Sequence, residues 1–247
     1  MESHTAKTIS GYLSIVSDLV AKWSSPESGE ARLWFRGQSR AEWHLAPGEY
    51  RYPTINPDEI RSEFVLKARD LLPRIPASDW EWYFIMQHWG LPTRLLDWTT
   101  GSLIALHFAV CHDTALHDAA VWILDPWALN EWSCGKPDLI LTSDTLAAKY
   151  LVAPYASIRL PARPVALVPS YNSPRITVQR GAFTVHGNKR NGIDEQCNKR
   201  LAKVILPKEI CVQVRRELRS AGISEFTLFP DLDGLSRDIR AAEVEGC

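Results

Sequence analysis

The chain lacks the cysteine pattern of a protein that is held together by metal ions or disulfides. It also lacks an excess of basic charge. Its five cysteines are scattered between positions 111 and 247 and include no Cys-x-x-Cys pair. This argues against a zinc knuckle and against a disulfide framework. The formal net charge of -1 excludes a globally basic nucleic-acid-binding protein, although it is compatible with a local basic groove.

Signals for export and membrane insertion are missing as well. The first residues, MESHTAKTISGY, contain neither a basic stretch nor an apolar one, so we predict no signal peptide. The sequence has no run of about 18 apolar residues, which is the length that a membrane-spanning helix needs. We therefore expect a cytoplasmic protein that makes no contact with a membrane.

What the sequence does contain is typical of a globular protein with a large core. Hydrophobic residues make up 45% of the chain and charged residues 23%. Ten tryptophans are many for 247 residues, and we expect several to be buried or to line a cleft. No repeat, low-complexity block or linker interrupts the pattern. We predict one α+β domain over residues 1–247, with a core at about 30–235 and an N-terminal helix at 9–23.

Hydrophobic periodicity predicts the other elements. Helices are expected over 58–72, capped by Asp58, and over 79–90, 102–111 and 208–221. Strands are expected over 32–36, 119–125 and 201–206, and a loop over 90–99. The segment 175–187 is predicted to be two strands joined by a tight turn at Gly181.

The stretch WFRGQS, residues 34–39, places an arginine directly after two large apolar residues. Gly37 after it allows close approach of a ligand or of another backbone, and Gln38 adds an amide. The guanidinium of Arg36 suits a bidentate contact with a phosphate or carboxylate. The alternative is a structural salt bridge with Asp97 or Glu63.

A second stretch of candidates runs from residue 87 to residue 109. Gln87 lies on the apolar face of its predicted helix and needs a polar partner, with His88 beside it. Arg94 and Asp97 are three positions apart and close enough to pair with each other.

Hydroxyl and amide groups complete the candidate set. Thr99 and Thr100 stand at the start of a predicted helix, where they either cap its backbone or present hydroxyls to a ligand. Gln179 is placed two residues before Gly181 on a predicted strand, with Phe183 continuing the same face. The alternative for Gln179 is an inward amide satisfied by backbone.

Four segments in this order resemble the FRG domain, a family named for its Phe-Arg-Gly motif. They are residues 34–39, 87–109, 175–187 and 222–235.

The same order is similar, more distantly, to ADP-ribosyltransferases of the Arg–Ser–Glu type. Those enzymes have an Arg-Gly at the end of one strand, a Ser-Thr-Ser strand leading into a helix, and a Glu on a later strand. This resemblance implies a split or mixed β-sheet flanked by helices, with NAD as the substrate. It implies that Arg36 holds the NAD pyrophosphate or ribose, that Thr99 or Thr100 braces the nicotinamide ribose, and that Trp98 stacks on nicotinamide. The implied catalytic set is Arg36, Thr99 and Gln179, and the implied NAD-binding set is Arg36, Gly37, Gln38, Trp98, Thr99, Thr100 and Phe183.

The chain departs from the transferase pattern at the position of the catalytic acid, which reads Gln179. An amide can bind a ribose hydroxyl, but it cannot act as a general base or stabilise a cation by its charge. We expect a nearby acid to supply the charge, with Asp97 and Glu195 as candidates. The alternatives are catalysis by positioning alone, or binding without reaction.

Three functions remain open. The first is an NAD-dependent ADP-ribosyltransferase that modifies a macromolecule, with RNA favoured over DNA or protein. Such an enzyme would serve as a toxin or anti-phage effector restrained by an antitoxin or chaperone. The second is an RNA-binding or nuclease-type toxin, and the third a non-enzymatic ligand-binding or interaction domain. The second would use a basic cleft formed by Arg36, Arg40, Arg94, Arg175 and Arg180.

Other chemistries find no support. The sequence has no nucleophile elbow, dinucleotide-binding glycine motif, P-loop or HExxH motif. His107 has no acidic partner at ligand spacing on its own predicted helix, so we expect no metal site.

Overall fold

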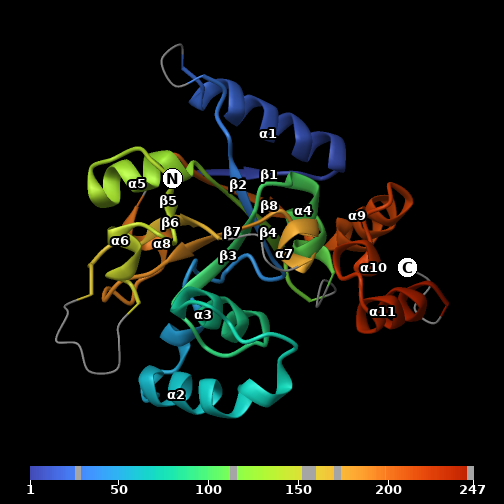
Figure 1. Cartoon of the computed structure of the whole chain (residues 1–247). Helices are drawn as coiled ribbons and strands as arrows, with labels where there is room; N and C mark the ends of the chain where they lie inside the picture. Colours follow the sequence, from blue (N-terminus) through green and yellow to red (C-terminus); the bar gives the residue numbers. More distant parts are fainter. Residues whose placement is uncertain (26–28, 112–115, 152–159, 170–173, 198, 244–247) are drawn as a thin grey trace.

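A computed structural model describes residues 1–25, 29–111, 116–151, 160–169, 174–197 and 199–243; the side chains of residues 174 and 175 are not among the described parts. The described residues form one mixed sheet of eight strands, flanked by helices (Figure 1). Along the chain the strands are β1 (Glu2–Thr5), β2 (Trp34–Gln38), β3 (Leu95–Thr99), β4 (Ala119–Leu124), β5 (Ile140–Leu141), β6 (Val165–Val168), β7 (Gly181–Val185) and β8 (Leu201–Leu206).

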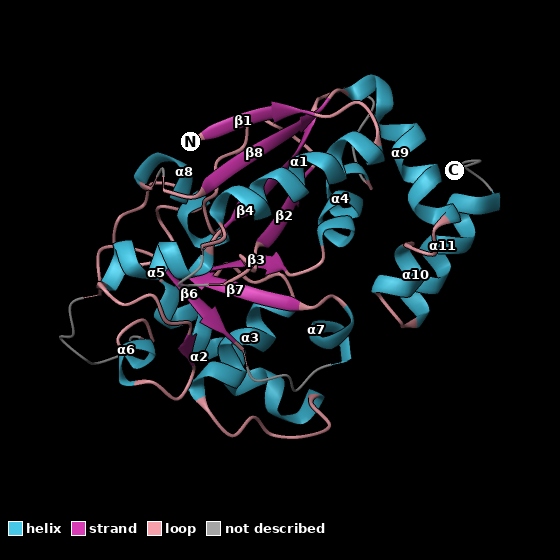
Figure 2. Cartoon of the chain, turned by 90° about the horizontal axis from the view of Figure 1, so that it is seen from above, coloured by secondary structure: helices cyan, strands magenta, loops and turns pink. Residues whose placement is uncertain are grey.

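Helices surround this sheet on several sides. In Figure 1, α1 and the pair α2 and α3 lie at opposite ends of the view, and in Figures 1 and 2 the helices α9 to α11 gather at one side. No helix in the described ranges is long and apolar enough to cross a membrane. The helices are α1 (Ile9–Trp23), α2 (Pro57–Ala68), α3 (Asp79–His88), α4 (Ser102–Val110), α5 (Pro126–Cys134), α6 (Thr145–Ala148), α7 (Pro174–Val178), α8 (Ile193–Gln196), α9 (Lys208–Ser220), α10 (Glu225–Leu228) and α11 (Leu232–Glu243), with 3-10 turns η1 (Gly48–Arg51) and η2 (Arg69–Leu71).

The sheet divides into two halves that meet between β2 and β3. The strand order is β1-β8-β4-β2-β3-β7-β6-β5. Strand β2 pairs with β4 along its whole length, and β3 does the same with β7. Between β2 and β3 the register has one pair, Phe35 with Thr99, after which the two strands separate. The split leaves backbone groups of both strands free for other partners.

Three apolar clusters form the core, and the second of them contains residues from both halves of the sheet. The first packs α1, α4 and α9 against β2, β4 and β8, with Val121 and Leu206 fully buried. The second covers the opposite face around Trp122 and Leu129. The third packs the aromatic helix α3 against β3, β6 and β7. Several tryptophans are buried in or beside these clusters, as the composition predicts: Trp23, Trp34, Trp80, Trp82, Trp98 and Trp122.

Helix α1 begins and ends where the periodicity predicts, and its first turn is capped by Thr8, whose hydroxyl accepts from the backbone N–H of Gly11. The predicted cap of α2 is wrong by two residues. Asn56 is the N-cap, and its side chain accepts from the N–H of Asp58.

Two predictions of local structure are wrong. The expected loop at 90–99 contains β3, whose apolar side chains are buried on both faces of the sheet, so that the sequence shows no alternation. The expected strand at 175–178 is the short helix α7. A proline stands at its first position, and Arg180 turns the chain with a φ of 48° before β7 begins.

Candidate functional site

A cavity of about 620 Å³ opens where β2 and β3 separate. This volume falls in the range of small-molecule and cofactor sites. Its wall includes one residue from each predicted catalytic position: Arg36 in β2, Thr99 at the end of β3, and Gln179 just before β7. The split of the sheet therefore brings to one place three residues that are up to 143 positions apart in the chain (179 − 36).

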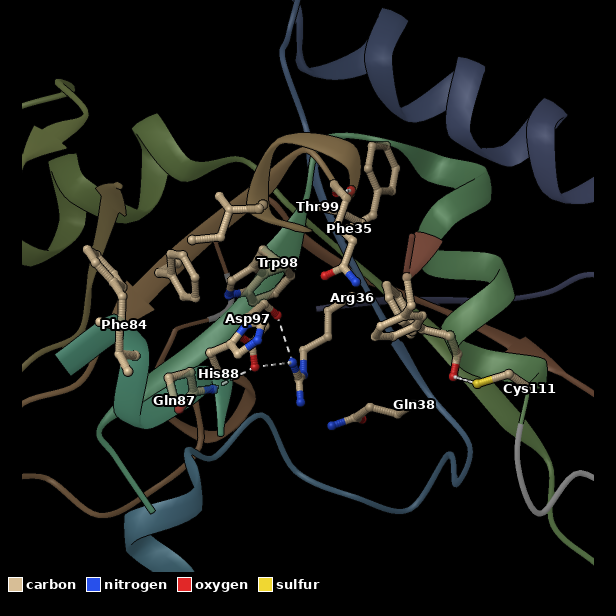
Figure 3. A pocket seen from close by; sticks show the side chains of 18 of the residues that line it. Phe35, Arg36, Gln38, Phe84, Gln87, His88, Asp97, Trp98, Thr99 and Cys111 are labelled. Atoms are coloured by element: carbon tan, nitrogen blue, oxygen red, sulfur yellow. Dashed lines mark hydrogen bonds and ion pairs between the residues drawn. The ribbon is translucent and has the colours of Figure 1, made fainter. Parts of the chain in front are cut away.

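Arg36 bridges the gap between the two halves of the sheet. Its Nη1 donates to the backbone carbonyl of Asp97 at 2.7 Å, and the same nitrogen lies 3.8 Å from the Asp97 carboxylate (Figure 3). Burial lowers the pKa of Arg36, and the charge of Asp97 opposes this effect. Its Nε has no hydrogen-bond partner among the described residues. Arg36 is thus partly structural, because it joins the two strands, and its side chain also lines the cavity.

Asp97 is held in place by a short chain of hydrogen bonds. Its Oδ2 accepts from Nε2 of Gln87 at 2.7 Å, and Oε1 of Gln87 accepts from the hydroxyl of Thr93 at 2.5 Å. The side chain of Asp97 remains 55% exposed at the cavity. Gln87 therefore has the polar partner that its position requires, and it fixes a carboxylate beside Arg36.

The expected pairing of Arg94 with Asp97 is wrong. Arg94 is buried on the other side of β3 and lies 3.6 Å from the carboxylate of Glu49. Its remaining donors reach the carbonyl oxygens of Tyr150 and His186. Arg94 is a structural cation with no place in the cavity wall.

Glu63 does not pair with Arg36 either. Its carboxylate forms an ion pair with the ammonium group of Lys67 on the surface of α2. Of the two partners expected for Arg36, the structure supplies Asp97.

The hydroxyl of Thr99 is committed to the backbone. Its Oγ1 donates to the carbonyl of Gln179 at 2.7 Å and accepts from the N–H of Gly101 at 3.0 Å. Thr99 thereby connects Gly101, the N-cap of α4, to the turn before β7, but it does not cap the first turn of α4. Thr100 is exposed and is not part of the cavity wall.

Gln179 lies in the turn between α7 and β7, not on a strand. Its Nε2 donates to the carbonyl of Leu228 at 3.1 Å. The amide therefore connects this turn to α10, and it lines the cavity while doing so. Phe183, predicted to share its face, packs against Phe84 at a ring distance of 4.9 Å in the same wall.

Gly37, Gln38 and Trp98 have structural partners. A Cβ at Gly37 would lie 2.1 Å from the carbonyl oxygen of Ala105. The missing side chain therefore makes room for the backbone of α4, not for a ligand. Gln38 accepts from the indole N–H of Trp122 and donates to the carbonyl of His44. Trp98 is buried and lines the cavity, and its indole N–H donates to Thr184.

The remaining candidates separate into one that faces the cavity and one that does not. His88 lines it. Glu195 lies in α8 and accepts from the backbone N–H of Gly192 at 2.8 Å, which makes it part of a helix cap. Of the two acids expected to supply charge, Asp97 therefore stands in the cavity and Glu195 outside it.

Of the four arginines expected in a basic cleft whose side chains the structure describes, Arg36 lines the cavity and Arg40, Arg94 and Arg180 do not. Arg94 is buried elsewhere, and the side chain of Arg175 lies outside the described residues. Two other arginines that the sequence did not single out, Arg51 and Arg74, line the cavity instead.

The sequence also missed an aromatic residue at the cavity. Trp43 is 41% exposed and lines the wall, with the guanidinium of Arg40 at 5.5 Å and that of Arg51 at 6.0 Å from its ring. The signal that could have found it is a tryptophan three residues after an arginine in the loop that follows WFRGQS.

A polar group at the far side of the cavity comes from segments 118 positions apart. Nε2 of His107 lies 3.2 Å from Oε1 of Glu225, and Nε of Arg237 donates to the other carboxylate oxygen at 3.0 Å. Burial alone would raise the pKa of Glu225, but His107 and Arg237 together lower it. Sequence reasoning sought a partner for His107 on its own helix, whereas the partner is on α10.

Cys111 stands beside this group and also lines the cavity. Burial raises the pKa of its thiol to about 12. Without a bound cation, this thiol is uncharged at neutral pH and is a poor nucleophile, so the arrangement does not favour cysteine-based covalent catalysis.

Comparisons with known proteins give one match. No curated protein and no solved structure matches the chain. The one family match covers the segments around Arg36 and Thr99. It does not extend to the segment around Gln179. Residues 31–118 match the FRG domain.

Proposed function

We propose that this protein is an NAD-dependent ADP-ribosyltransferase that modifies a macromolecular acceptor, with RNA favoured. The observation that carries the proposal is the convergence of Arg36, Thr99 and Gln179 on one cavity at the split of the sheet. Strands β2, β3 and β7, on or beside which they lie, are neighbours in the sheet. This is the arrangement that the transferase resemblance implies.

Charge in the cavity suits a dinucleotide. Arg36, Arg51 and Arg74 line it, and a pyrophosphate needs such donors. The side chain of Arg36 is 20% exposed and lines the cavity, so we assign its guanidinium to a phosphate oxygen of the ligand. Aromatic and apolar residues such as Phe84 and Phe183 form the rest of the wall, as is typical of cofactor sites.

Asp97 takes the role of the catalytic acidic residue, because the amide of Gln179 carries no charge and cannot act as a base. In the transfer, the bond between nicotinamide and the ribose breaks, and an acceptor nucleophile forms the new bond to the same ribose carbon. The ribose carries positive charge in between, which a fixed carboxylate stabilises. Gln87 holds the carboxylate of Asp97 in the cavity, and that carboxylate accepts the proton from the acceptor.

Trp43 gives the acceptor a platform at the cavity. Exposed aromatic rings flanked by arginines stack on unpaired bases, which favours single-stranded RNA over protein. An enzyme that modifies cellular RNA requires restraint, so the proposal includes an antitoxin or chaperone as a partner.

The test is incubation of the purified protein with NAD labelled in its ADP-ribose part, together with RNA, DNA or cell lysate in separate reactions. We expect label on RNA and release of nicotinamide. Asp97→Asn should lower turnover by about 10²–10³-fold while NAD still binds. Binding of NAD without any nicotinamide release would instead identify the protein as a non-enzymatic ligand-binding domain.

A further inference from the structure

Three side chains with metal-binding atoms meet at one side of the cavity. They are His107, Cys111 and Glu225, whose ligand atoms all lie within 4.8 Å of one another. His107 and Cys111 are one helical turn apart at the end of α4, so their side chains project from the same face. Glu225 is the first residue of α10 and reaches His107 directly.

The donor atoms are those that zinc prefers. An imidazole nitrogen, a thiolate and a carboxylate oxygen bind Zn²⁺ with bonds of about 2.0–2.3 Å, which places the ligand atoms about 3.3–3.8 Å apart in a tetrahedron. Binding therefore draws the three side chains closer by up to about 1 Å, and the ion displaces the proton of the Cys111 thiol. Three protein ligands leave a fourth position of the tetrahedron open, which is the composition of catalytic rather than structural zinc sites. Cys111 and Glu225 both line the cavity, so that position faces a space large enough for water or substrate.

Contacts around the three residues hold them in place. Arg237 donates to the carboxylate oxygen of Glu225 that does not contact His107, and it also contacts Asp233. Arg215 donates to the backbone carbonyl of Cys111 at 3.4 Å, which connects the end of α4 to α9. Hydrogen bonds to a ligating carboxylate from outside the metal site orient it and are common in zinc proteins.

We propose that His107, Cys111 and Glu225 bind one Zn²⁺ ion at the wall of the cavity. The competing account is a structural ion pair between His107 and Glu225, in which Cys111 takes no part. The two accounts differ in what they require of the thiol, because an ion pair persists when Cys111 is replaced.

The experiment measures zinc bound to the full chain, without NAD. Protein freed of metal with a chelator is dialysed against Zn²⁺, and the retained metal is counted by mass spectrometry. A parallel sample takes up Co²⁺, which gives an intense near-ultraviolet absorption when bound to a thiolate. Cys111→Ser and Glu225→Gln are compared with Cys134→Ser, a matched control at a half-buried free cysteine in α5 that is not part of the cluster.

We expect one zinc ion per wild-type chain and the thiolate absorption with cobalt. Cys111→Ser should lose both, Glu225→Gln should bind zinc at least tenfold more weakly, and Cys134→Ser should behave as wild type. Circular dichroism checks that the variants are folded. A wild-type protein that retains no zinc, or undiminished binding in Cys111→Ser, would overturn the proposal. Neither result depends on NAD turnover, so this proposal and the proposed function can fail separately.

Discussion

At the scale of single residues, the site consists of side chains that each serve the fold and the cavity at once. Arg36 donates to the backbone carbonyl of Asp97 across the split of the sheet, and its side chain also lines the cavity. Gln179 bonds to α10 and lines the same space. Because these contacts are already made before a ligand binds, the site is preorganised.

Gln179 provides the first prediction. Gln179→Ala leaves the carbonyl of Leu228 without its donor, and Gln179→Glu places a second acceptor against it. Both variants should therefore melt at a lower temperature than wild type, Gln179→Glu more so. If Gln179 contributes to the reaction, turnover of NAD falls in Gln179→Ala and is partly kept in Gln179→Glu, whose charge favours a cationic transition state.

Both quantities are measured beside Gln213→Ala and Gln213→Glu, controls at an exposed glutamine of α9. Unchanged turnover in Gln179→Ala would remove this residue from the mechanism and leave Asp97 as the group to pursue.

His186 provides a prediction about pH. It is fully buried, and burial, together with the charges of Arg36 and Arg94, lowers its pKa to about 3. In the unfolded chain its pKa is about 6.5. Between these values the unfolded state holds a proton that the folded state does not, so the free energy of unfolding decreases as the pH falls below 6.5.

The loss attributable to His186 amounts to about 2 kcal/mol between pH 7.5 and pH 5. Urea unfolding of wild type and His186→Gln at both pH values isolates it, because all other titrating groups are shared. Equal losses in the two proteins would show that His186 becomes protonated in the folded state.

Sequence reasoning at this scale identified residues better than it identified their partners. It found Arg36, Gln87 and Asp97, which lie together in the cavity. It paired Arg94 with Asp97 because they are close in the chain, whereas Glu49 is the partner in space. Glu225 was not identified from the sequence, because its partner His107 is 118 positions away and no local pattern indicates such a contact.

At the scale of elements, the contact between β2 and α4 places the cavity wall. Strand β2 packs so closely on α4 that Gly37 has the backbone of Ala105 and Ala109 where a side chain would begin. The close approach brings Phe108 and Cys111 of α4 to the same cavity as Arg36. The sequence left two roles open for Gly37, the close approach of a ligand or of another backbone. The structure shows the close approach of a backbone, that of α4.

Gly37→Ala should therefore destabilise the protein strongly. Its added methyl group meets backbone atoms that cannot move without separating β2 from α4, and overpacking of this kind costs about 1–3 kcal/mol or more. Gly48→Ala is the matched control, because the nearest atom to its added Cβ is 3.6 Å away. Thermal melting should show a loss of several degrees for Gly37→Ala and little change for Gly48→Ala. Similar melting of the two would contradict the packing described.

Elements with one strong local signal were predictable, and the others were not. Helix α1 follows from its apolar stripe and its threonine cap. Strand β3 is buried on both faces and lacks alternation, and α7 is short and rich in β-branched residues that favour strands. Strand β1 forms by parallel pairing with β8 at the other end of the chain, which a local window cannot detect.

At the scale of the whole molecule, the position of the cavity follows from how the sheet divides. Helix α3 packs on one half of the sheet, and α1, α4 and α9 pack on the other. The mixed sheet with flanking helices agrees with the predicted fold class. The separation of β2 from β3 depends on which strands are neighbours, which is a property of the complete chain and not of any local pattern.

The central claim is that this cavity binds NAD through Arg36, and calorimetric titration of NAD into the protein tests it most directly. Wild type and Arg69→Ala, a control at an exposed arginine of η2, should bind alike. Arg36→Ala should bind about 10- to 100-fold more weakly, since a charge-assisted contact of roughly 1.5–3 kcal/mol is lost. Melting of Arg36→Ala in parallel must show a folded protein for the comparison to count. No binding of NAD to wild type at millimolar concentration, or equal affinity in a folded Arg36→Ala, would contradict the claim.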